Sequence, residues 1–426
     1  MQTDFTPEQL ADPATAAANG IIRNCVHCGF CTATCPTYLL QGDELDSPRG
    51  RIYLIKDMLE KGGTPATAAV THVDRCLSCL SCMTTCPSDV NYMHLVDTAR
   101  AHIEAKFRRP WPDRALRKML SMVLPRRGLF RLSLRLSGLV RPFAGLFPGR
   151  LKAMLAMAPG ALPVAGWAEN PGVFAASGPR LKRVALHAGC VQPVLRPSVD
   201  EATIRLLNRQ GVEVVIAPAQ GCCGALDHHM GKTGKAAAFA KANILAWEHE
   251  IDGAGLDAII ITASGCGTVI KDYAHLLASE PAWEARARRI CVLAVDVSEF
   301  LAGLPPLPSV IAPGLAIAYH SACSLQHGQS IRTQPKQLLQ QAGFAVRDVP
   351  EGHICCGSAG TYSILQPDLS QRLKARKLGN IARTGAAIVA SGNIGCMTYL
   401  AGGAITTVHT AELLDWASGG PRPPGI

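Results

Sequence analysis

The sequence has 426 residues and a mass of 45.1 kDa, enough for two or three domains with a sizeable buried core. Hydrophobic residues make up 48% of it and charged residues 17%, which excludes a chain disordered throughout, because such chains are rich in charge. The formal net charge of +10 comes from one segment: residues 106–152 hold thirteen basic residues and one acid. Aromatic residues make up only 5%, which argues against a base-stacking nucleic-acid surface.

Cysteine is used more heavily than packing alone requires. The sequence contains 17 cysteines, an odd number, and its first residues lack the basic and apolar segments of a secretory signal. The longest uncharged apolar run, residues 153–168, is interrupted by Pro159 and Pro163 and is too short to cross a bilayer. We therefore expect a cytoplasmic protein, with metal or redox chemistry rather than a disulfide framework.

Two cysteine runs near the N-terminus, residues 25–36 and 76–87, share the spacing C-x2-C-x2-C-x3-C-P. In such tandem ferredoxin-like segments three close thiolates bind one [4Fe–4S] cluster, and the fourth cysteine of the run ligates the other cluster. Structural zinc sites instead usually join two CxxC pairs across a longer loop, so the spacing favours iron–sulfur. It predicts two clusters, with the ligands Cys25, Cys28, Cys31 and Cys86 for one and Cys76, Cys79, Cys82 and Cys35 for the other.

The residues between and within the runs allow fewer conclusions. Ser47 followed by Pro48 indicates a helix start, with the serine as its cap. Arg49 and Arg51 come next, and they either belong only to this packed helix or offset the negative charge of a cluster. His27, inside the first run, is expected to face solvent rather than to bind metal.

The basic segment alternates arginines with leucines at helical spacing, and prolines and glycines divide it into short pieces. A basic amphipathic helix is typical of a membrane-surface element, because its apolar face enters the headgroup region and its arginines meet anionic lipid. The alternative is a connector that packs on its own domains or on a partner subunit. No nucleic-acid motif accompanies the charge.

The C-terminal half contains an internal duplication. In each copy a His-x-x-Cys motif is followed, 32 positions after its cysteine, by a Cys-Cys-Gly triplet, and then by one more cysteine. The histidines are His187 and His320. The cysteines are Cys190, Cys222, Cys223 and Cys266 in the first copy and Cys323, Cys355, Cys356 and Cys396 in the second. Cys291 has no counterpart and is expected in an apolar core strand.

Each copy alternates expected strands and helices, which predicts a parallel sheet with covered faces. The expected strands are 184–189, 212–217 and 258–262, then 316–320, 344–349 and 386–390. The expected helices are 198–210 and 233–250, then 333–342 and 368–383. Ser198 and Glu201 are expected to form a capping box. The paired cysteines follow strand ends, where open α/β sheets place their ligands.

The cysteine runs, the Asp46-Ser-Pro-Arg-Gly-Arg51 helix start, the basic connector and the two CCG repeats together resemble the iron–sulfur subunits of bacterial glycolate oxidases (glycolate dehydrogenases) over nearly the whole chain. More broadly, they resemble the corresponding subunits of anaerobic glycerol-3-phosphate dehydrogenase, lactate-utilisation complexes and heterodisulfide reductase. The expected fold is α/β, with an α-helical tandem [4Fe–4S] ferredoxin-like domain before a duplicated parallel α/β CCG domain. The expected divisions are 1–105 (ferredoxin-like), 106–178 (connector), 179–304 (repeat 1) and 305–426 (repeat 2).

The resemblance implies a CCG pattern that ends in CxxC and supplies five cysteines, with a non-cubane [4Fe–4S] cluster in some relatives. This sequence departs from it, because Val269 and Tyr399 stand where the last cysteine is expected. Two interpretations stay open for each repeat: a further cluster held by four cysteines, with or without His187 or His320, and a degenerate quinone or docking site.

No flavin or nicotinamide fingerprint follows a strand, so two cubanes without a two-electron cofactor need a flavin partner. The resemblance implies an electron-transfer subunit without catalytic residues of its own, in a complex whose FAD subunits oxidise glycolate to glyoxylate. It would pass the electrons to a quinone-type acceptor, with peripheral attachment at the cytoplasmic face of the inner membrane. The alternatives are a lactate or glycerol-3-phosphate dehydrogenase subunit, a reductase with chemistry at the CCG sites resembling heterodisulfide reductase, and a zinc scaffold.

Overall fold

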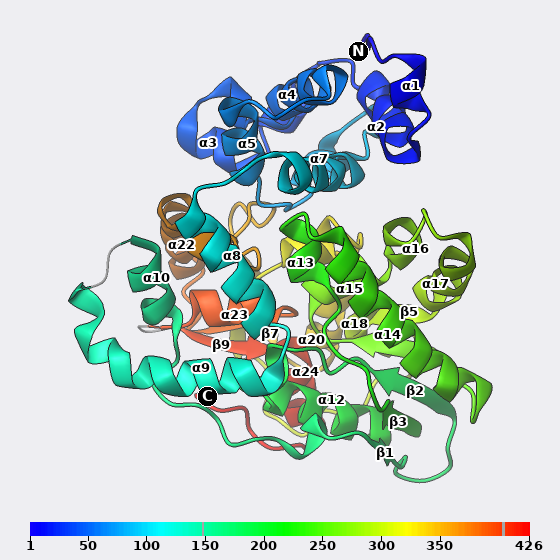
Figure 1. Cartoon of the computed structure of the whole chain (residues 1–426). Helices are drawn as coiled ribbons and strands as arrows, with labels where there is room; N and C mark the ends of the chain where they lie inside the picture. Colours follow the sequence, from blue (N-terminus) through cyan, green and yellow to red (C-terminus); the bar gives the residue numbers. More distant parts are fainter. Residues whose placement is uncertain (147–148, 403–404) are drawn as a thin grey trace.

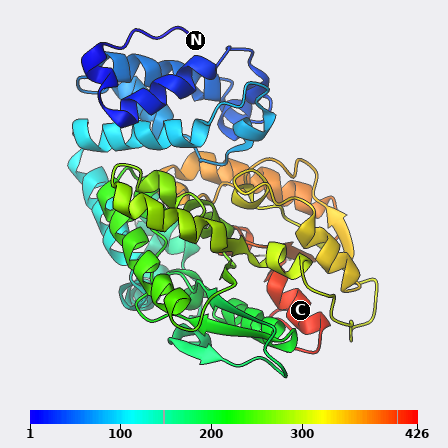
Figure 2. The same cartoon turned by 90° about the vertical axis from the view of Figure 1, so that its right-hand side faces the viewer.

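The computed structural model describes residues 1–146, 149–402 and 405–426. A helical N-terminal part lies above two α/β units in Figure 1, and a set of connector helices runs down one side and across the bottom. Turning the molecule shows the same layering, with the helical part on top of both units (Figure 2). The structure confirms the predicted fold class: a helical segment followed by a duplicated parallel α/β domain.

The N-terminal part is built from short helices that are joined by the two cysteine loops. Ser47 caps the helix that begins at Pro48, as predicted, and its Oγ accepts a hydrogen bond from Gly50 N at 3.0 Å. The core is formed by apolar side chains of α2, α4, α5 and α7. The helices are α1 (Pro7–Leu10), α2 (Pro13–Asn24), α3 (Pro36–Gln41), α4 (Pro48–Lys61), α5 (Thr67–Asp74), α6 (Ser81–Thr85) and α7 (Tyr92–Lys106).

The connector forms the helices α8 (Trp111–Val123), α9 (Arg127–Val140) and α10 (Gly149–Met157). Its first part is anchored by buried charge: Arg109 Nη1 lies 2.5 Å from Asp74 Oδ2, and Arg117 Nη2 lies 3.2 Å from the same oxygen. In α9 only Phe130 is buried, so most of that helix faces outward. No helix in the described ranges is long and apolar enough to span a membrane.

Repeat 1 has a five-stranded sheet in the order β1-β3-β2-β4-β5, parallel except for the edge strand β1. Helices cover both faces of the sheet. The strands are β1 (Gly172–Phe174), β2 (Lys182–Leu186), β3 (Val212–Ile216), β4 (Ala258–Ile261) and β5 (Ala294–Asp296). The helices are α11 (Gln192–Leu195), α12 (Ser198–Arg209), α13 (Ala225–His229), α14 (Thr233–Asp252), α15 (Ser264–Ile270), α16 (Tyr273–Leu276), α17 (Pro281–Leu293) and α18 (Val297–Ala302).

Repeat 2 has an all-parallel sheet in the equivalent order β7-β6-β8-β9. One continuous apolar core joins the two repeats, because α12 and α18 pack against α20 and α24 between the sheets. The strands are β6 (Ala316–Tyr319), β7 (Ala345–Asp348), β8 (Ile388–Ser391) and β9 (Thr406–His409). The helices are α19 (Cys323–Gln326), α20 (Gln334–Gln341), α21 (Tyr362–Leu365), α22 (Pro367–Ala382), α23 (Ile394–Leu400) and α24 (Thr410–Ala417).

Two local predictions were wrong. Ser198 and Glu201 form no capping box: Ser198 Oγ donates to Glu412 Oε1 of repeat 2 at 2.6 Å, and Glu201 Oε1 accepts from Trp167 N at 3.1 Å. Contacts between distant segments have replaced the local cap. Cys291 lies in α17 and not in a strand, because the apolar run around it continues a helix before β5 begins at Ala294.

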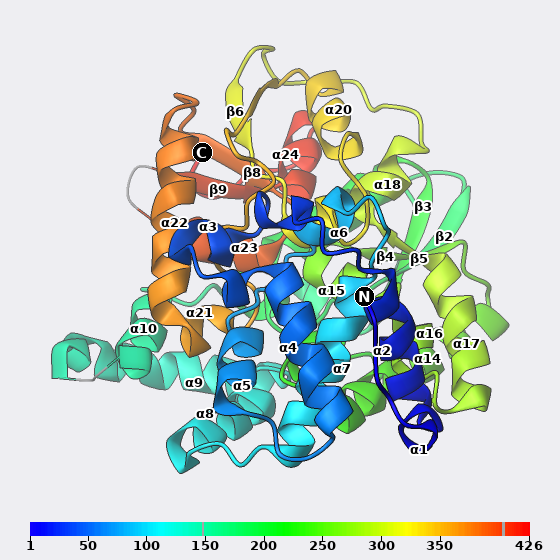
Figure 3. The same cartoon turned by 90° about the horizontal axis from the view of Figure 1, so that it is seen from above.

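The N-terminal part contacts both repeats on the side where the strands end. Seen from above, α3 lies beside α22 of repeat 2, and α7 lies over repeat 1 beside α13 (Figure 3). Polar contacts hold the second junction: His94 Nε2 lies 3.0 Å from Asp272 Oδ1, and Asp97 Oδ2 lies 3.2 Å from His228 Nε2. The N-terminal part is therefore held on the side of both repeats where their strands end.

The glycine of each Cys-Cys-Gly triplet is needed for a close approach. Gly357 has a φ of +92°, and a Cβ at this position would lie 2.6 Å from the carbonyl oxygen of Ser370 in α22. We expect Gly357→Ala to lower the free energy of unfolding by about 2–4 kcal/mol, since it adds backbone strain and overlap. Denaturant unfolding of the anaerobically purified chain measures the change.

The control is Gly379→Ala in the exposed interior of α22, where a Cβ would meet nothing within 4 Å. This change should stabilise by about 0.5–1 kcal/mol, because alanine favours the helix. Equal effects of the two substitutions would contradict the close approach at Gly357.

Candidate metal centres

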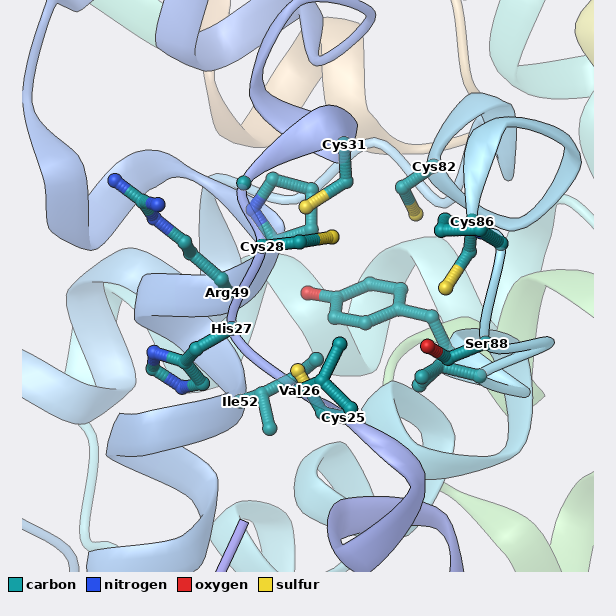
Figure 4. Close-up of a pocket in the computed structure, with 15 residues that line it drawn as sticks. Cys25, Val26, His27, Cys28, Cys31, Arg49, Ile52, Cys82, Cys86 and Ser88 are labelled. Atoms are coloured by element: carbon teal, nitrogen blue, oxygen red, sulfur yellow. The ribbon is translucent and has the colours of Figure 1, made fainter.

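The first cysteine run forms a pocket that also receives a cysteine from the second run. Cys25, Cys28 and Cys31 come from the loop after α2, and Cys86 follows α6. Figure 4 shows their sulfur-bearing side chains around one space, with Cys82 at its far side. Burial raises the pKa of Cys31 to about 11, whereas Cys28 is exposed. Four thiols around one pocket form the donor set that a [4Fe–4S] cluster takes.

The second run lies deeper in the molecule. Burial raises the pKa of Cys79 and of Cys82, and the charges of neighbouring thiols, including Cys35, raise both further. Cys35 from the first run is thus a neighbour of the second run, in the way that Cys86 is a neighbour of the first. Among the described residues, no hydrogen bond joins two of these eight thiols. The thiols are grouped around spaces rather than packed on one another, which fits two clusters.

The two loops share one backbone conformation although their sequences differ. The residue before the second cysteine is left-handed in both, at His27 (φ 57°) and Ser78 (φ 51°). The residue after that cysteine is left-handed as well, at Gly29 (φ 85°) and Leu80 (φ 61°). A leucine in this region is uncommon. The second loop therefore holds Leu80 in this conformation, which orients the neighbouring cysteines. His27 faces solvent, as predicted.

A buried arginine reaches the second set of thiols. Arg51 is 1% exposed, and its Nη1 lies 3.8 Å from Cys35 Sγ, while its Nη2 donates to Thr37 Oγ1 at 2.9 Å. The carboxylate of Asp46 is fully buried and also accepts from Arg75 Nη1 at 2.9 Å. His72 Nδ1 lies 2.9 Å from the same carboxylate. The carboxylate of Asp46 thus pairs with two guanidinium groups, those of Arg51 and Arg75. Because one negative charge faces two positive ones, a net positive charge remains beside Cys35.

In repeat 1 the predicted cysteines converge where β2, β3 and β4 end. Ligand atoms of His187, Cys223 and Cys266 all lie within 4.8 Å of one another. The neighbouring thiol of Cys223, and then His187, lower the pKa of Cys266 to about 6. The histidine and the two thiols thus lie close enough to bind one metal ion.

Repeat 2 reproduces this arrangement with His320, Cys356 and Cys396, whose ligand atoms also lie within 4.8 Å of one another. The Sγ atoms of Cys356 and Cys396 are 3.5 Å apart, and Asn393 Nδ2 donates to Cys396 Sγ at 3.2 Å. All four cysteines of repeat 2 are buried. Both repeats therefore bring histidine and cysteine ligands together, as the positions after the strands predicted.

Comparison with known proteins agrees with this geometry. Residues 21–90 match the family model of the 4Fe-4S dicluster domain, and residues 184–271 and 317–401 match that of the cysteine-rich domain, CCG. The glycolate oxidase iron-sulfur subunit of Escherichia coli is 42% identical over 98% of this chain and 99% of its own length. The probable glycolate oxidase iron-sulfur subunit of Bacillus subtilis is 31% identical over 94% and 95%, respectively.

This chain belongs to the family of glycolate oxidase iron–sulfur subunits. Lactate utilization protein A of Geobacillus kaustophilus is 27% identical, over 55% of this chain and 98% of its own length. A crystal structure of a hypothetical protein from Helicobacter pylori shares the fold, with a TM-score of 0.56 and 12% identity, over 96% of this chain and 73% of that chain. The resemblance that the motifs predicted is thereby confirmed at the level of the family.

Sequence reasoning missed the groups that surround the thiols. Asp46 was noted only as part of the helix start, His72 and Arg75 precede the second run without a motif of their own, and Arg51 was only one of two arginines with an open role. Arg49, the other, pairs with Glu44 near the surface, its Nε 2.5 Å from Oε1. The sequence did offer one signal for such a group: Arg51 stands in a predicted helix between the two cysteine runs.

Arg51 should tune the cluster that Cys35 ligates. We expect Arg51→Met to lower its reduction potential by roughly 60 mV or more, a tenfold change in a one-electron equilibrium, because a buried positive charge favours the reduced state. Arg51→Lys, which keeps the charge, should produce a smaller shift. Redox titration followed by electron paramagnetic resonance measures both.

The matched control is Arg49→Met, two residues away. Its guanidinium is one-third exposed, pairs with Glu44 and lines the pocket of the first run, so this change should leave the potential of the cluster that Cys35 ligates nearly unchanged. Equal shifts in the Arg49 and Arg51 variants would show that Arg51 has no special influence on the cluster.

Proposed function

We propose that this chain is the electron-transfer subunit of a glycolate-oxidising dehydrogenase, and that it carries electrons through two [4Fe–4S] clusters. The observation that supports the proposal is the pocket that Cys25, Cys28 and Cys31 of the first run line together with cysteines of the second run, Cys86 among them. We assign Cys25, Cys28, Cys31 and Cys86 to one cluster, and Cys76, Cys79, Cys82 and Cys35 to the other. When bound, such clusters are one-electron carriers.

The substrate-oxidising step is proposed to take place in a partner. The 42% identical relative is named a glycolate oxidase subunit, and this chain has no nucleotide-binding fingerprint for a flavin of its own. An FAD-bearing subunit that oxidises glycolate would therefore supply the electrons. The lactate utilization relatives match only 55% of this chain, which makes a lactate-oxidising complex the weaker alternative.

We propose that electrons enter at the exposed loop of the first run. Cys28 is exposed, and the apolar side chains of Val26 and Phe30 in the same loop have exposed fractions of 67% and 62%. Apolar and aromatic side chains are typical of protein interfaces. The second run is covered by repeat 2, so the loop at Cys28 is the accessible end for a flavin subunit.

The connector is proposed to attach the complex to the cytoplasmic face of the inner membrane, where a quinone is the acceptor. The second half of α9 and the segment after it expose a run of large apolar side chains: Leu132, Leu136, Leu139, Phe143, Leu146 and Leu151. The basic residues Arg135, Arg141 and Lys152 lie exposed among them. A basic surface with exposed leucines fits anionic lipid.

We retain the domain division at 1–105, 106–178, 179–304 and 305–426. Its support is that α7 ends at Lys106 and that the segment between α18 and β6 joins the repeats, although the edge strand β1 of the first sheet falls within the connector range. Limited proteolysis of the purified chain would test these boundaries.

The metal content tests the function most directly. Anaerobically purified chain should hold at least about eight irons, four for each cubane, with a matching amount of acid-labile sulfide. A chain that contains mainly zinc and negligible sulfide would refute the iron–sulfur assignment.

If each run supplies one ligand to the other run's cluster, a substitution in one run should affect the cluster of the other run. Cys86→Ser should perturb the cluster of the first run, because Cys86 lines the same pocket as Cys25, Cys28 and Cys31. Electron paramagnetic resonance of the two clusters reads out the change. Cys35→Ser is the matched control and should perturb the cluster of the second run; if each variant lost only its own run's cluster, the crossover would be wrong.

The membrane proposal predicts salt-sensitive binding. The sequence alone suggested replacing Arg126, Arg127, Arg131 and Arg135, but Arg127 donates to the carbonyls of Gly189 and Glu169, and Arg131 pairs with Glu169. The exposed side chains are the better choice. Arg135→Gln with Arg141→Gln should weaken binding of the complex to anionic vesicles by about 1 kcal/mol for each charge at low salt.

The control is the pair Arg288→Gln and Arg289→Gln on α17, which lies away from the connector (Figure 1). It should leave vesicle binding unchanged. A complex that ignores anionic vesicles at low salt would contradict membrane attachment and favour a subunit interface at α9.

A further inference from the structure

The two repeats do not lie equally close to the N-terminal clusters. Cys79 packs into an apolar cluster that contains Cys323 and Cys355 of repeat 2, and Leu77 of the same loop belongs to this cluster too. Tyr362 closes the junction, and its hydroxyl donates to the carbonyl of Arg75 at 3.0 Å. The counterparts in repeat 1, Cys190 and Cys222, share no such cluster with an N-terminal cysteine among the described residues. The N-terminal part meets repeat 1 through the polar contacts of α7.

The histidine of repeat 2 is placed as a metal ligand. His320 is 1% exposed, and neither of its ring nitrogens has a hydrogen-bond partner among the described residues. A buried imidazole without a partner is costly. It faces Cys356 and Cys396 within the 4.8 Å that separate possible ligands of one metal.

His187 of repeat 1 is equally buried and equally without partners, so the histidine alone does not distinguish the repeats. The difference lies on the long helix after each triplet. Gly224 approaches Ala236 in α14 as Gly357 approaches Ser370 in α22, and this fixes the register of the two helices. Seven residues further on, repeat 1 has Asn243 where repeat 2 has Lys377.

These two residues do different things. Asn243 is neutral and holds its own loop, because its Oδ1 accepts from Gly221 N at 2.8 Å and its Nδ2 donates to the carbonyl of Cys222 at 2.9 Å. Lys377 is 1% exposed, and in the described part of the chain its Nζ donates to a single acceptor, the carbonyl of Glu351 at 3.0 Å. A buried ammonium is costly unless a negative charge lies near it. The carboxylate of Glu351 lies near Lys377, and so does the thiol of Cys323. Thiolates of repeat 2 that bind metal would add further negative charge on this side of the ammonium.

We infer that repeat 2, and not repeat 1, receives electrons from the N-terminal clusters, at an iron centre that Cys356, Cys396 and His320 ligate and that Lys377 balances. This inference rests on the proposed electron-transfer function. Each step moves one electron: the N-terminal part is oxidised, the centre in repeat 2 is reduced, and no bond forms or breaks. The added electron makes the centre more negative, and Lys377 stabilises this reduced state.

The duplication supplies matched variants for the test. In the full chain, purified anaerobically, we expect iron beyond the eight of the two cubanes and a third redox-active centre. His320→Gln should remove that centre or displace its signal, whereas His187→Gln should leave it in place. Iron analysis and electron paramagnetic resonance read out both, and the signals of the two N-terminal clusters show that the variants are folded.

A second pair of variants covers the case in which His320→Gln fails to fold. Lys377→Asn, which gives repeat 2 the residue of repeat 1, should lower the potential of the third centre by about 59 mV or more, a tenfold change for one electron. Lys336→Asn on α20, an exposed lysine paired with Asp348, should not shift it. Magnetic coupling between the third centre and the nearer cubane is also expected.

Three results would overturn the inference: zinc instead of iron in repeat 2, a third centre that is lost in His187→Gln but kept in His320→Gln, or no redox-active centre beyond the two cubanes. Each of them leaves the two N-terminal clusters, and with them the proposed electron-transfer function, intact. Loss of the cubane signals in the unmodified chain would instead refute that function.

Discussion

Burying thiolates that carry a cluster places negative charge in the protein interior, and that charge must be balanced. The N-terminal part achieves this with Arg51, whose guanidinium reaches Cys35 and is held in place by Asp46 and Thr37. Asp46 also binds Arg75, so the carboxylate fixes both cations without neutralising both. The helix that starts at Ser47 and Pro48 carries this arginine near its beginning, and the side chain of Arg51 is buried.

The same constraint explains how a duplicated framework can diverge in function. Both repeats place a histidine and four cysteines at the ends of equivalent strands, and both need a glycine where the triplet approaches the next helix. At one register position they differ in charge, with Asn243 in repeat 1 and Lys377 in repeat 2. Packing thus fixes the backbone and the ligands of both sites. A single side chain can still change the charge near each site.

The cysteine spacing, the parallel sheets and the positions of ligands after strands could be predicted, since each depends on short-range periodicity or on local loops. Contacts between distant segments could not. Ser198 donates to Glu412 across the repeats instead of capping its own helix, and Cys291 continues a helix although its neighbours resemble a strand. The roles of the connector arginines could not be predicted for the same reason. Arg117 pairs with Asp74 and Arg131 pairs with Glu169, and both of these partners are remote in sequence.

The connector gives the proposed electron route a direction. The exposed loop at Cys28 lies in the N-terminal part at the top of Figure 1, and α9 runs across its lower left. From α9 the chain continues to α10, which packs against α21 and α22 of repeat 2. The helix that carries Lys377 is therefore also the one on which the proposed membrane-surface segment rests. An acceptor dissolved in the lipid would approach the chain from the side of repeat 2, while a flavin subunit at Cys28 would bind at the opposite end. Entry and exit are thus separated by the length of the molecule, and the junction of Cys79 with Cys323 and Cys355 is the contact that joins them.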